Sequence, residues 1–217
     1  MRIVVAGRDA ALWLSAVLLQ RALAPAGVTV SVVELPATRG PADVHPALPP
    51  LEALHNQIGI DEAALLRTIG GCFSLGQNFT DASGMAPAFL HAYGGAGAPI
   101  AGGDFFAYWL KARRYGLPVP LEDFSLTAAA ARHGRLLIPN EETEVYGRSD
   151  YGYHLPAAAH ARSLRSLAEK AGVAIHSADT ARPVLDSERG DIVALETASG
   201  RIEGDLFIHA TGPEAAL

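Results

Sequence analysis

The chain has 217 residues, of which 49% are hydrophobic and 18% are charged, and its 17 basic and 23 acidic side chains give a formal net charge of −6. This composition supports one large hydrophobic core or two small ones, and the acidic balance excludes the basic face that binds nucleic acid. The single cysteine, Cys72, excludes a disulfide framework and a multi-cysteine metal site.

The first predicted elements are a strand, a tight turn, a helix and a second strand. Residues 2–6 are a β-branched run typical of a buried parallel strand, and residues 9–24 repeat apolar side chains at helical spacing. Residues 28–34 form the second strand, which ends in the acid Glu34. This order is typical of the start of a dinucleotide-binding domain, whose turn is normally rich in glycine.

The rest of the chain predicts a mixed α/β fold without an internal repeat or a flexible linker, so we expect one domain over residues 1–217. The predicted helices cover residues 51–59, 61–70, 104–116, 120–134 and 154–172. The predicted loops cover residues 35–50, 80–104 and 135–152, and successive strands follow from residue 173. The last strand, within residues 205–212, is apolar on both faces, which predicts a buried central strand.

The sequence gives no signal for a membrane or a metal. No apolar run reaches the ~18 residues of a membrane span, and the N-terminus has no basic segment or cleavage site of a signal peptide. We therefore expect a cytoplasmic protein. His154 and His160 lie six positions apart, which is not a metal-ligand spacing on a helix, and we expect no metal site.

The order of several segments resembles the flavin-dependent tryptophan halogenases. After Glu34 come Pro49 and Pro50, then "IGIDEAALLRTIGGCFSLGQNF", "YWL", "YGYHLPAAAHARSLRSLAEKAGV" and "GRIEGDLFIHATG". The resemblance covers almost the whole chain. It implies a Rossmann-like FAD-binding domain of the halogenase or aromatic-hydroxylase type, represented by its N-terminal half only. It also implies an oxidoreductase that uses FAD, oxygen and halide, with a lysine that relays the halogen to an aromatic substrate.

The phosphate turn departs from the pattern G-x-G-x-x-G, whose glycine positions fall here on Gly7, Asp9 and Leu12. The second glycine lets the backbone approach the pyrophosphate, and the third allows close packing of helix on strand. Asp9 adds a negative charge, which we expect to cap the helix, and Leu12 adds bulk. One interpretation is a weakened FAD site that uses Gly7, Glu34 for the ribose hydroxyls, and Gly212. The other is a strand, turn and helix kept only for the core.

The resemblance places the relay lysine of the family at Ser74 and an arginine of the family at Asn78. The flavin-lining Gly-Glu-Ala-Thr segment falls on residues 44–47, which read Val-His-Pro-Ala. No catalytic residue is therefore expected, and the chain should be inactive as a halogenase. The alternative is a non-catalytic remnant or protein-interaction module that keeps the fold without FAD. Because the last strand would lose apolar cover, we also expect self-association or a completing partner chain.

Overall fold

The computed structural model describes residues 1–136 and 149–212, and the chain divides into two compact units. The first unit contains Met1–His45, His55–Gly71 and Leu155–Leu217, and the second contains Pro46–Leu54 and Cys72–His154. Whether the units fold as one domain over residues 1–217 stays a prediction. The loop predicted for residues 135–152 lies mostly outside the described residues.

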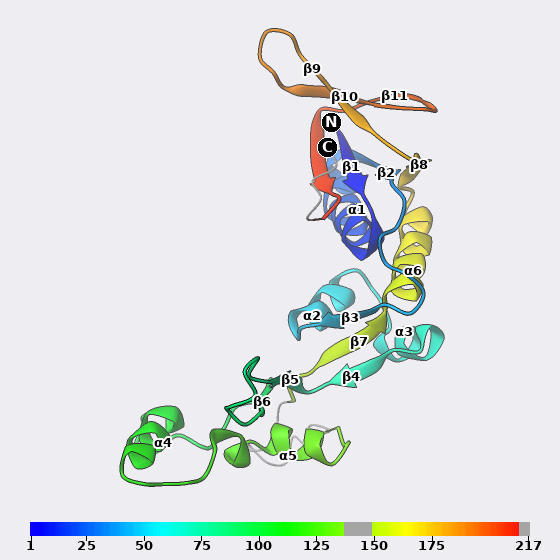
Figure 1. The fold of residues 1–217 in the computed structure, drawn as a ribbon. Coiled ribbons are helices and arrows are strands. Elements are labelled where there is room, and N and C mark those ends of the chain that lie inside the picture. The colour runs from blue at the N-terminus through cyan, green and yellow to red at the C-terminus, as the bar shows by residue number, and fades with distance from the viewer. Residues whose placement is uncertain (137–148, 213–217) are drawn as a thin grey trace. The chain divides into compact units, whose positions relative to one another are not determined.

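A four-stranded parallel sheet forms the centre of the first unit (Figure 1). Its strands are β1 (Arg2–Gly7), β2 (Thr29–Glu34), β8 (Ala174–Ser177) and β12 (Leu206–Ala210), in the order β12-β1-β2-β8. Five of the six residues of β1 are buried, as expected for a parallel strand that is covered on both faces. The strand, helix and strand predicted for residues 2–34 are therefore confirmed.

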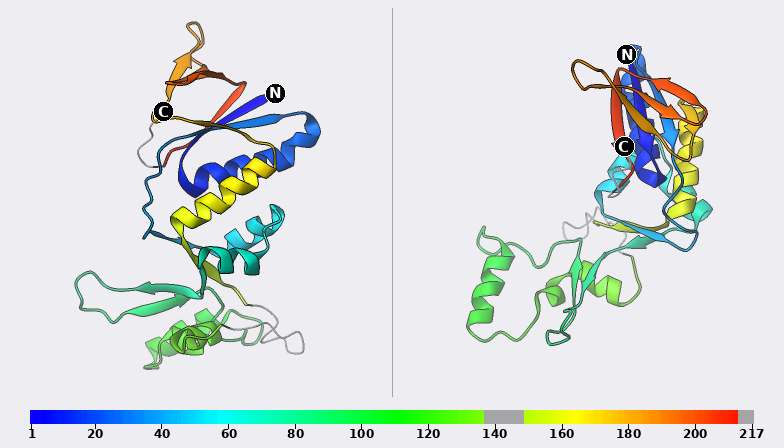
Figure 2. Two further views of the ribbon diagram at one scale, coloured as in Figure 1. Left: turned by 90° about the vertical axis from the view of Figure 1, so that its right-hand side faces the viewer. Right: turned by 45° about the horizontal axis from the view of Figure 1, so that its top comes forward.

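The two faces of this sheet have different covers. On one face, α1 (Asp9–Leu23) and α6 (Ala157–Lys170) lie side by side and enclose the larger apolar core (Figure 2). On the other face, Leu195 of a small antiparallel sheet packs against Val4, Ala6 and Val33. That sheet has the order β11-β10-β9 and consists of β9 (Arg182–Leu185), β10 (Ile192–Thr197) and β11 (Gly200–Glu203).

The remaining short helices of the first unit are η1 (Ala24–Ala26) and α3 (Glu62–Ile69). Helix α2 (Pro50–Gln57) is divided between the units, because the second unit includes it up to Leu54 and the first unit resumes at His55. The Oδ1 atom of Asp61 accepts a hydrogen bond from the Ala64 N–H at 2.7 Å and caps α3. Gly70 ends this helix in the left-handed conformation. The two helices predicted between residues 51 and 70 are therefore confirmed.

The second unit is built from short strands and helices. A three-stranded sheet has the order β3-β7-β4 and a hairpin joins β5 to β6. Their bounds are β3 (Val44–Ala47), β4 (Cys72–Ser74), β5 (Gly76–Phe79), β6 (Phe89–Ala92) and β7 (Gly152–Pro156). The first two residues of β3 and the last two of β7 belong to the first unit. The helices are α4 (Phe105–Arg114), η2 (Leu121–Phe124) and α5 (Leu126–Arg132). Strands β3 and β6 lie in segments that we predicted mainly as loops.

Two predicted helices have different bounds in the structure. The helix predicted over residues 154–172 begins only at Ala157, because Gly152–Pro156 form strand β7 and Pro156 occupies the N-cap position. The helix predicted over residues 120–134 is divided at Ser125. The Ser125 hydroxyl accepts a hydrogen bond from the Ala128 N–H at 3.2 Å, so a new helix begins there.

The prediction that residues 205–212 contain a buried central strand is wrong. Strand β12 lies at an edge of the parallel sheet, and within the described residues it pairs only with β1. Leu206 is 45% exposed, and the other residues of β12 are exposed or half-buried. Ile208 and Ala210 pack on the cluster at one face of the sheet and Phe207 on the cluster at the other, so both faces have partial cover and the exposure comes from the edge position.

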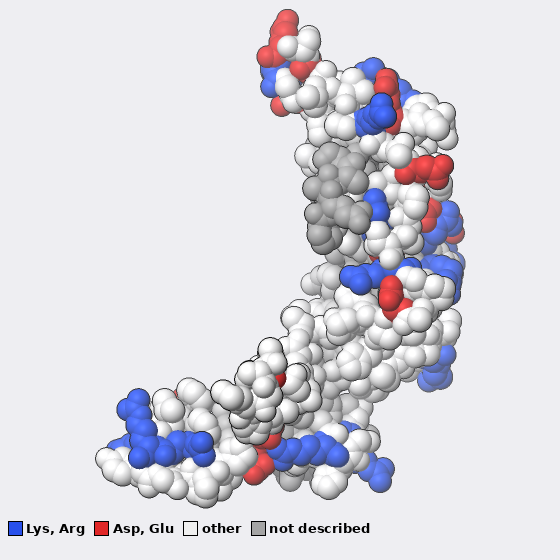
Figure 3. Space-filling model, in the orientation of Figure 1, with Lys and Arg blue, Asp and Glu red and all other residues white. Residues whose placement is uncertain are grey.

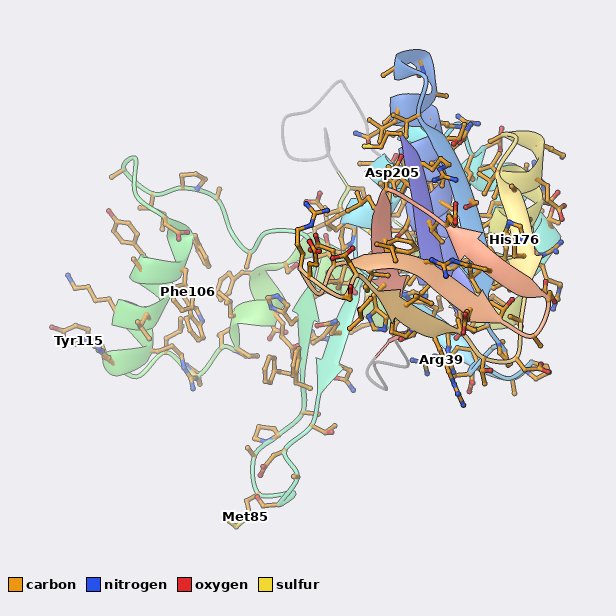
Figure 4. The ribbon with its side chains drawn as sticks, turned by 90° about the horizontal axis from the view of Figure 1, so that it is seen from above. Arg39, Met85, Phe106, Tyr115, His176 and Asp205 are labelled. Carbon is orange, nitrogen blue, oxygen red and sulfur yellow. The ribbon has the colours of Figure 1, made fainter. Side chains whose placement is uncertain are left out.

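The second unit exposes many large apolar side chains. Helix α4 buries none of its residues, although it carries two phenylalanines, a tyrosine, a tryptophan and a leucine. Figure 4 shows Phe106 on this helix, Tyr115 at its end, and Met85 at the tip of the loop between β5 and β6. Met85 is 88% exposed and Tyr115 is 83% exposed. This surface is unusually apolar for a region that meets water.

Candidate functional site

The carboxyl ends of the parallel strands bring the predicted cofactor residues together. In the strand register, Gly7 lies opposite Glu34 on β2 and opposite Ala210 on β12. Ligands of open α/β sheets bind beyond this edge. Gly212 follows two residues after Ala210 and has a φ of +81°, so it forms a left-handed turn at the same edge. The structure thus places Gly7, Glu34 and Gly212 at one edge of the sheet, and their role in binding FAD stays a prediction.

Gly7 has a packing role that does not depend on a ligand. A Cβ atom at this position would lie 2.2 Å from the carbonyl oxygen of Ala210, which is far inside contact distance. The next residue, Arg8, donates its backbone N–H to the same carbonyl oxygen at 3.1 Å. The first glycine of the turn is therefore required by the close approach of β1 and β12.

Asp9 links the phosphate turn to the loop that follows β2. Its φ of +57° lies in the left-handed region, which glycine adopts readily and aspartate adopts less often. Its Oδ2 atom accepts hydrogen bonds from the Thr38 hydroxyl at 2.8 Å and from the Thr38 N–H at 3.3 Å. The predicted helix-capping role is wrong, because Arg8 occupies the N-cap position and Asp9 bonds to the loop after β2 instead.

Leu12 fills the core at the position of the third glycine. Its side chain is fully buried in the apolar cluster between α1 and the parallel sheet. Trp13 and Ala16 of the same helix belong to this cluster. The helix therefore packs on the strands through a large side chain rather than through the close backbone contact that glycine would allow.

Glu34 is bound by side chains of its own chain. Its Oε2 atom accepts hydrogen bonds from Ser177 Oγ at 3.1 Å and from Arg165 Nε at 3.3 Å. The Arg165 guanidinium also lies over the Trp13 ring, 5.6 Å from its centroid, and pairs with Glu169. Both partners bind Oε2, and among the described residues no partner binds Oε1, so the carboxylate keeps one acceptor oxygen.

Sequence reasoning did not identify Arg165 and Ser177. Ser177 ends the strand next to β2, and the register places it opposite Glu34. That position could be inferred once the strand order was known. Beside these residues lies an open hollow of about 370 Å³, which Leu35, Asp179 and Ser199 also line.

These residues do not fit a dinucleotide held in the G-x-G-x-x-G manner. The carboxylate of Asp9 stands where the pattern needs a bare backbone, and one oxygen of the acid that would receive the ribose is already paired. A helix N-terminus favours a nearby anion, and in this chain Asp9 supplies that anion from the first turn of α1. A side chain of the protein itself, that of Asp9, therefore occupies the position where the pattern would place the pyrophosphate.

Ser74, which the resemblance places at the family's lysine position, lies in the second unit on β4, opposite Gly152 of β7. Its side chain is nearly buried, with 7% of the residue exposed, and its hydroxyl donates to the Gly76 carbonyl oxygen at 3.2 Å. Asn78 is exposed on β5, and Pro46 and Ala47 form part of β3. Ser74 and the cofactor residues Gly7 and Glu34 thus belong to different units.

The sequence analysis did not identify a buried pair of histidines, His55 and His160. The Nε2 atoms of His55 on α2 and His160 on α6 are 3.3 Å apart, and both side chains are buried. Burial, aided by the neighbouring His55 and His45, lowers the pKa of His160 to about 3. Burial also lowers the pKa of His55, against an opposing effect of Glu62. The pair is therefore held in its neutral form near neutral pH.

Within residues 1–136 and 149–212, no helix is long and apolar enough to cross a membrane. No group of three or more His, Cys, Asp or Glu side chains there is arranged to hold a metal ion. These findings add no site to the one at the strand ends.

The parallel sheet, its turn at the carboxyl edge and the acid at the end of β2 define a Rossmann-like α/β domain of the FAD-binding type. The family model described as tryptophan halogenase matches residues 2–217. The chain therefore belongs to the tryptophan halogenase family, as the resemblance in the sequence indicated.

Solved structures and a curated relative agree with this assignment. BrvH, a flavin-dependent halogenase from Brevundimonas sp. BAL3, is 30% identical with a TM-score of 0.83, over 100% of this chain and 43% of its own. A flavin-dependent halogenase from Xanthomonas campestris is 31% identical with a TM-score of 0.82, over 95% and 41%. Tryptophan 6-halogenase ThaL from Streptomyces albogriseolus is 42% identical over 65 residues, which are 30% of this chain and 12% of ThaL. The chain thus spans about two fifths of the length of these solved halogenases.

Proposed function

We propose that this chain keeps the fold of the halogenase family, binds FAD weakly or not at all, and does not halogenate aromatic substrates. The observation that carries this proposal is the position of Asp9, whose carboxylate is bonded to Thr38 in the phosphate turn. The engagement of Glu34 by Arg165 and Ser177 supports it. The resulting protein is a pseudoenzyme, related to FAD-dependent oxidoreductases and monooxygenases by descent.

The charge of Asp9 would oppose a pyrophosphate. Two like charges 4 Å apart repel by about 4 kcal/mol at an effective dielectric constant near 20, and by about 1 kcal/mol in bulk water. A FAD molecule would also have to replace the hydrogen bonds that Thr38 gives to Asp9. Both effects weaken the affinity for flavin without disturbing the sheet.

Ser74 supports the absence of halogenation independently. The resemblance assigns this position to a lysine whose nitrogen carries the halogen to the substrate. The Ser74 hydroxyl has no cationic N–H, and it already donates to the Gly76 carbonyl oxygen. A chain that bound flavin would still need another group for this step.

The visible spectrum of the purified protein tests the proposal. We expect a colourless protein, and a titration with FAD that shows weak binding or none. A yellow protein with stoichiometric flavin absorption that survives gel filtration would contradict the proposal. The test uses the full chain and requires no substrate.

A second candidate function is that of a protein-interaction module. The apolar surface of α4 favours it, because none of the residues of this helix is buried. Half-exposed β12 adds a partly open strand in the other unit. We expect self-association or a bound partner chain. Light scattering after gel filtration tests this, and a sharp monomer peak without binding of a hydrophobic dye would contradict it.

A further inference from the structure

A groove between α3 and α6 lies in the first unit, apart from the strand ends. It has a volume of about 460 Å³, within the usual range for small-molecule sites. Helix α6 contributes one side of it, because positions 162, 163, 166, 167 and 170 share a helix face. Helix α3 contributes Thr68 and Ile69 on the other side.

All charged side chains that line this groove are positive. Its nine lining residues include Arg162 and Lys170 and no acidic residue. Within the described part of the chain, neither of these cations has an ion pair or a hydrogen bond through its side chain. The nearby acid Glu169 pairs with Arg165 on another side of α6. Lys and Arg atoms, with some Asp and Glu atoms between them, are visible along the side that carries α6 and α3 (Figure 3).

Hydroxyl groups line the same groove as these cations. Ser163 and Ser166 of α6 and Thr68 of α3 line the groove, and no hydrogen bond of their hydroxyls occurs among the described residues. A hydroxyl can donate to an anionic oxygen, and an arginine can bind two oxygens of one phosphate at once. The polar side of the groove is therefore suited to an anion with several oxygens.

The rest of the groove is apolar. Ile60, Ile69 and Leu167 line it beside the polar groups, and Ile69 is buried. A ligand that fits this lining has one anionic end and a small apolar body. Inorganic phosphate would use only the polar part, whereas an aryl or alkyl ester would cover both.

We propose that the groove between α3 and α6 binds a small soluble phosphate monoester, with Arg162, Lys170 and the hydroxyls on the phosphate and the isoleucines on the apolar body. Phenyl phosphate is a suitable probe because it has both parts. The proposal is independent of flavin, because none of the lining residues belongs to the phosphate turn or to the end of β2.

Isothermal titration calorimetry of the full chain tests this, with phenyl phosphate, inorganic phosphate and phenol at constant ionic strength. We expect saturable binding of one phenyl phosphate, several-fold weaker binding of inorganic phosphate, and no binding of phenol. The Arg162→Gln/Lys170→Gln variant should weaken binding at least tenfold, and Ser163→Ala/Ser166→Ala should weaken it several-fold. The variant Arg182→Gln/Arg189→Gln removes the same charge from the antiparallel sheet and should bind as the parent does.

Several results would overturn the proposal. They are no saturable heat with the parent, equal binding by the Arg162→Gln/Lys170→Gln variant, or an equal loss in the Arg182→Gln/Arg189→Gln control. Binding to phosphatidic-acid vesicles without binding of phenyl phosphate would overturn the assignment to a soluble ester. Circular dichroism of each variant checks that it is folded, and both cations in the groove are exposed, so their removal should leave the fold intact.

Discussion

Asp9 combines two properties that rarely meet in one residue. Its backbone adopts a left-handed conformation, and its carboxylate links the first turn of α1 to the loop that follows β2. Left-handed backbone costs a non-glycine residue free energy, which the two hydrogen bonds from Thr38 offset. The Asp9 side chain thus occupies a position in the turn that a glycine would leave empty.

The substitution Asp9→Gly should raise the affinity for FAD. It removes the charge, suits the positive φ, and frees Thr38. We expect at least a tenfold gain, which corresponds to about 1.4 kcal/mol. Flavin fluorescence titration measures it, with Asp9→Asn as the control that removes only the charge. Equal affinities for parent and Asp9→Gly would show that Asp9 does not limit binding.

The substitution Leu12→Gly should destabilise the protein strongly. It empties a fully buried position and adds a glycine to a helix, so we expect a loss of about 3–6 kcal/mol in the free energy of unfolding. Ala11→Gly on the exposed side of the same turn should cost only about 1 kcal/mol. Urea denaturation measures both. Equal losses would mean that Leu12 does not support the core.

At the scale of elements, β1 depends on close contact with β12. Gly7→Ala should destabilise the sheet, because the added Cβ would meet the Ala210 carbonyl at 2.2 Å. We expect a lower thermal midpoint and faster hydrogen exchange in β12. Gly40→Ala is the matched control, since the nearest atom to its Cβ would be 3.8 Å away. Unchanged exchange in β12 for Gly7→Ala would contradict the prediction.

The histidine pair joins α2 to α6 and should make stability depend on pH. The pKa of His160 is about 3 in the folded state, against an ordinary value near 6.5, so the unfolded chain takes up the proton first as the pH falls. Its contribution is complete above pH 6.5 and is lost progressively toward pH 3. His55 acts in the same direction, and Glu62 and His45 are the other titratable groups beside the pair.

Urea midpoints between pH 7.5 and pH 4.5 measure this effect. The variant His160→Leu should show a flatter profile than the parent, because it no longer excludes a proton from the folded core. His176→Leu changes an exposed histidine on β8 and should keep the parent profile. Parallel profiles for the parent and His160→Leu would contradict the assignment of this acid sensitivity to the pair.

At the scale of the whole molecule, the residues that the resemblance assigns to the cofactor, Gly7 and Glu34, and to the relay group, Ser74, fall in different units. The variant Ser74→Lys should therefore not halogenate tryptophan, because Asp9 still closes the phosphate turn. Mass spectrometry with reduced FAD, oxygen and chloride measures the product. A reaction without protein sets the background, and halogenated tryptophan above it from the parent or from Ser74→Lys would contradict the prediction.

The sequence predicted individual helices and strands better than the contacts between them. Periodicity was sufficient for β1, α1 and β2, because their apolar patterns are read directly as buried faces. Pairing at a distance could not be read this way: Arg165 and Glu34 are 131 positions apart, and only the packing of α6 brings them together. The exposure of β12 was also beyond prediction, since it depends on which strands flank it.

The contacts of Asp9 and Glu34 also bear on how the protein is maintained in a cell. A protein that binds flavin tightly gains stability from the free cofactor by mass action, and about 2.7 kcal/mol when the cofactor is at a hundredfold excess over Kd. Here Thr38, Arg165 and Ser177 supply the partners instead. We therefore expect the stability of this chain not to depend on the supply of riboflavin. Its abundance in the cell should stay constant when riboflavin is limiting and true flavoenzymes become less abundant.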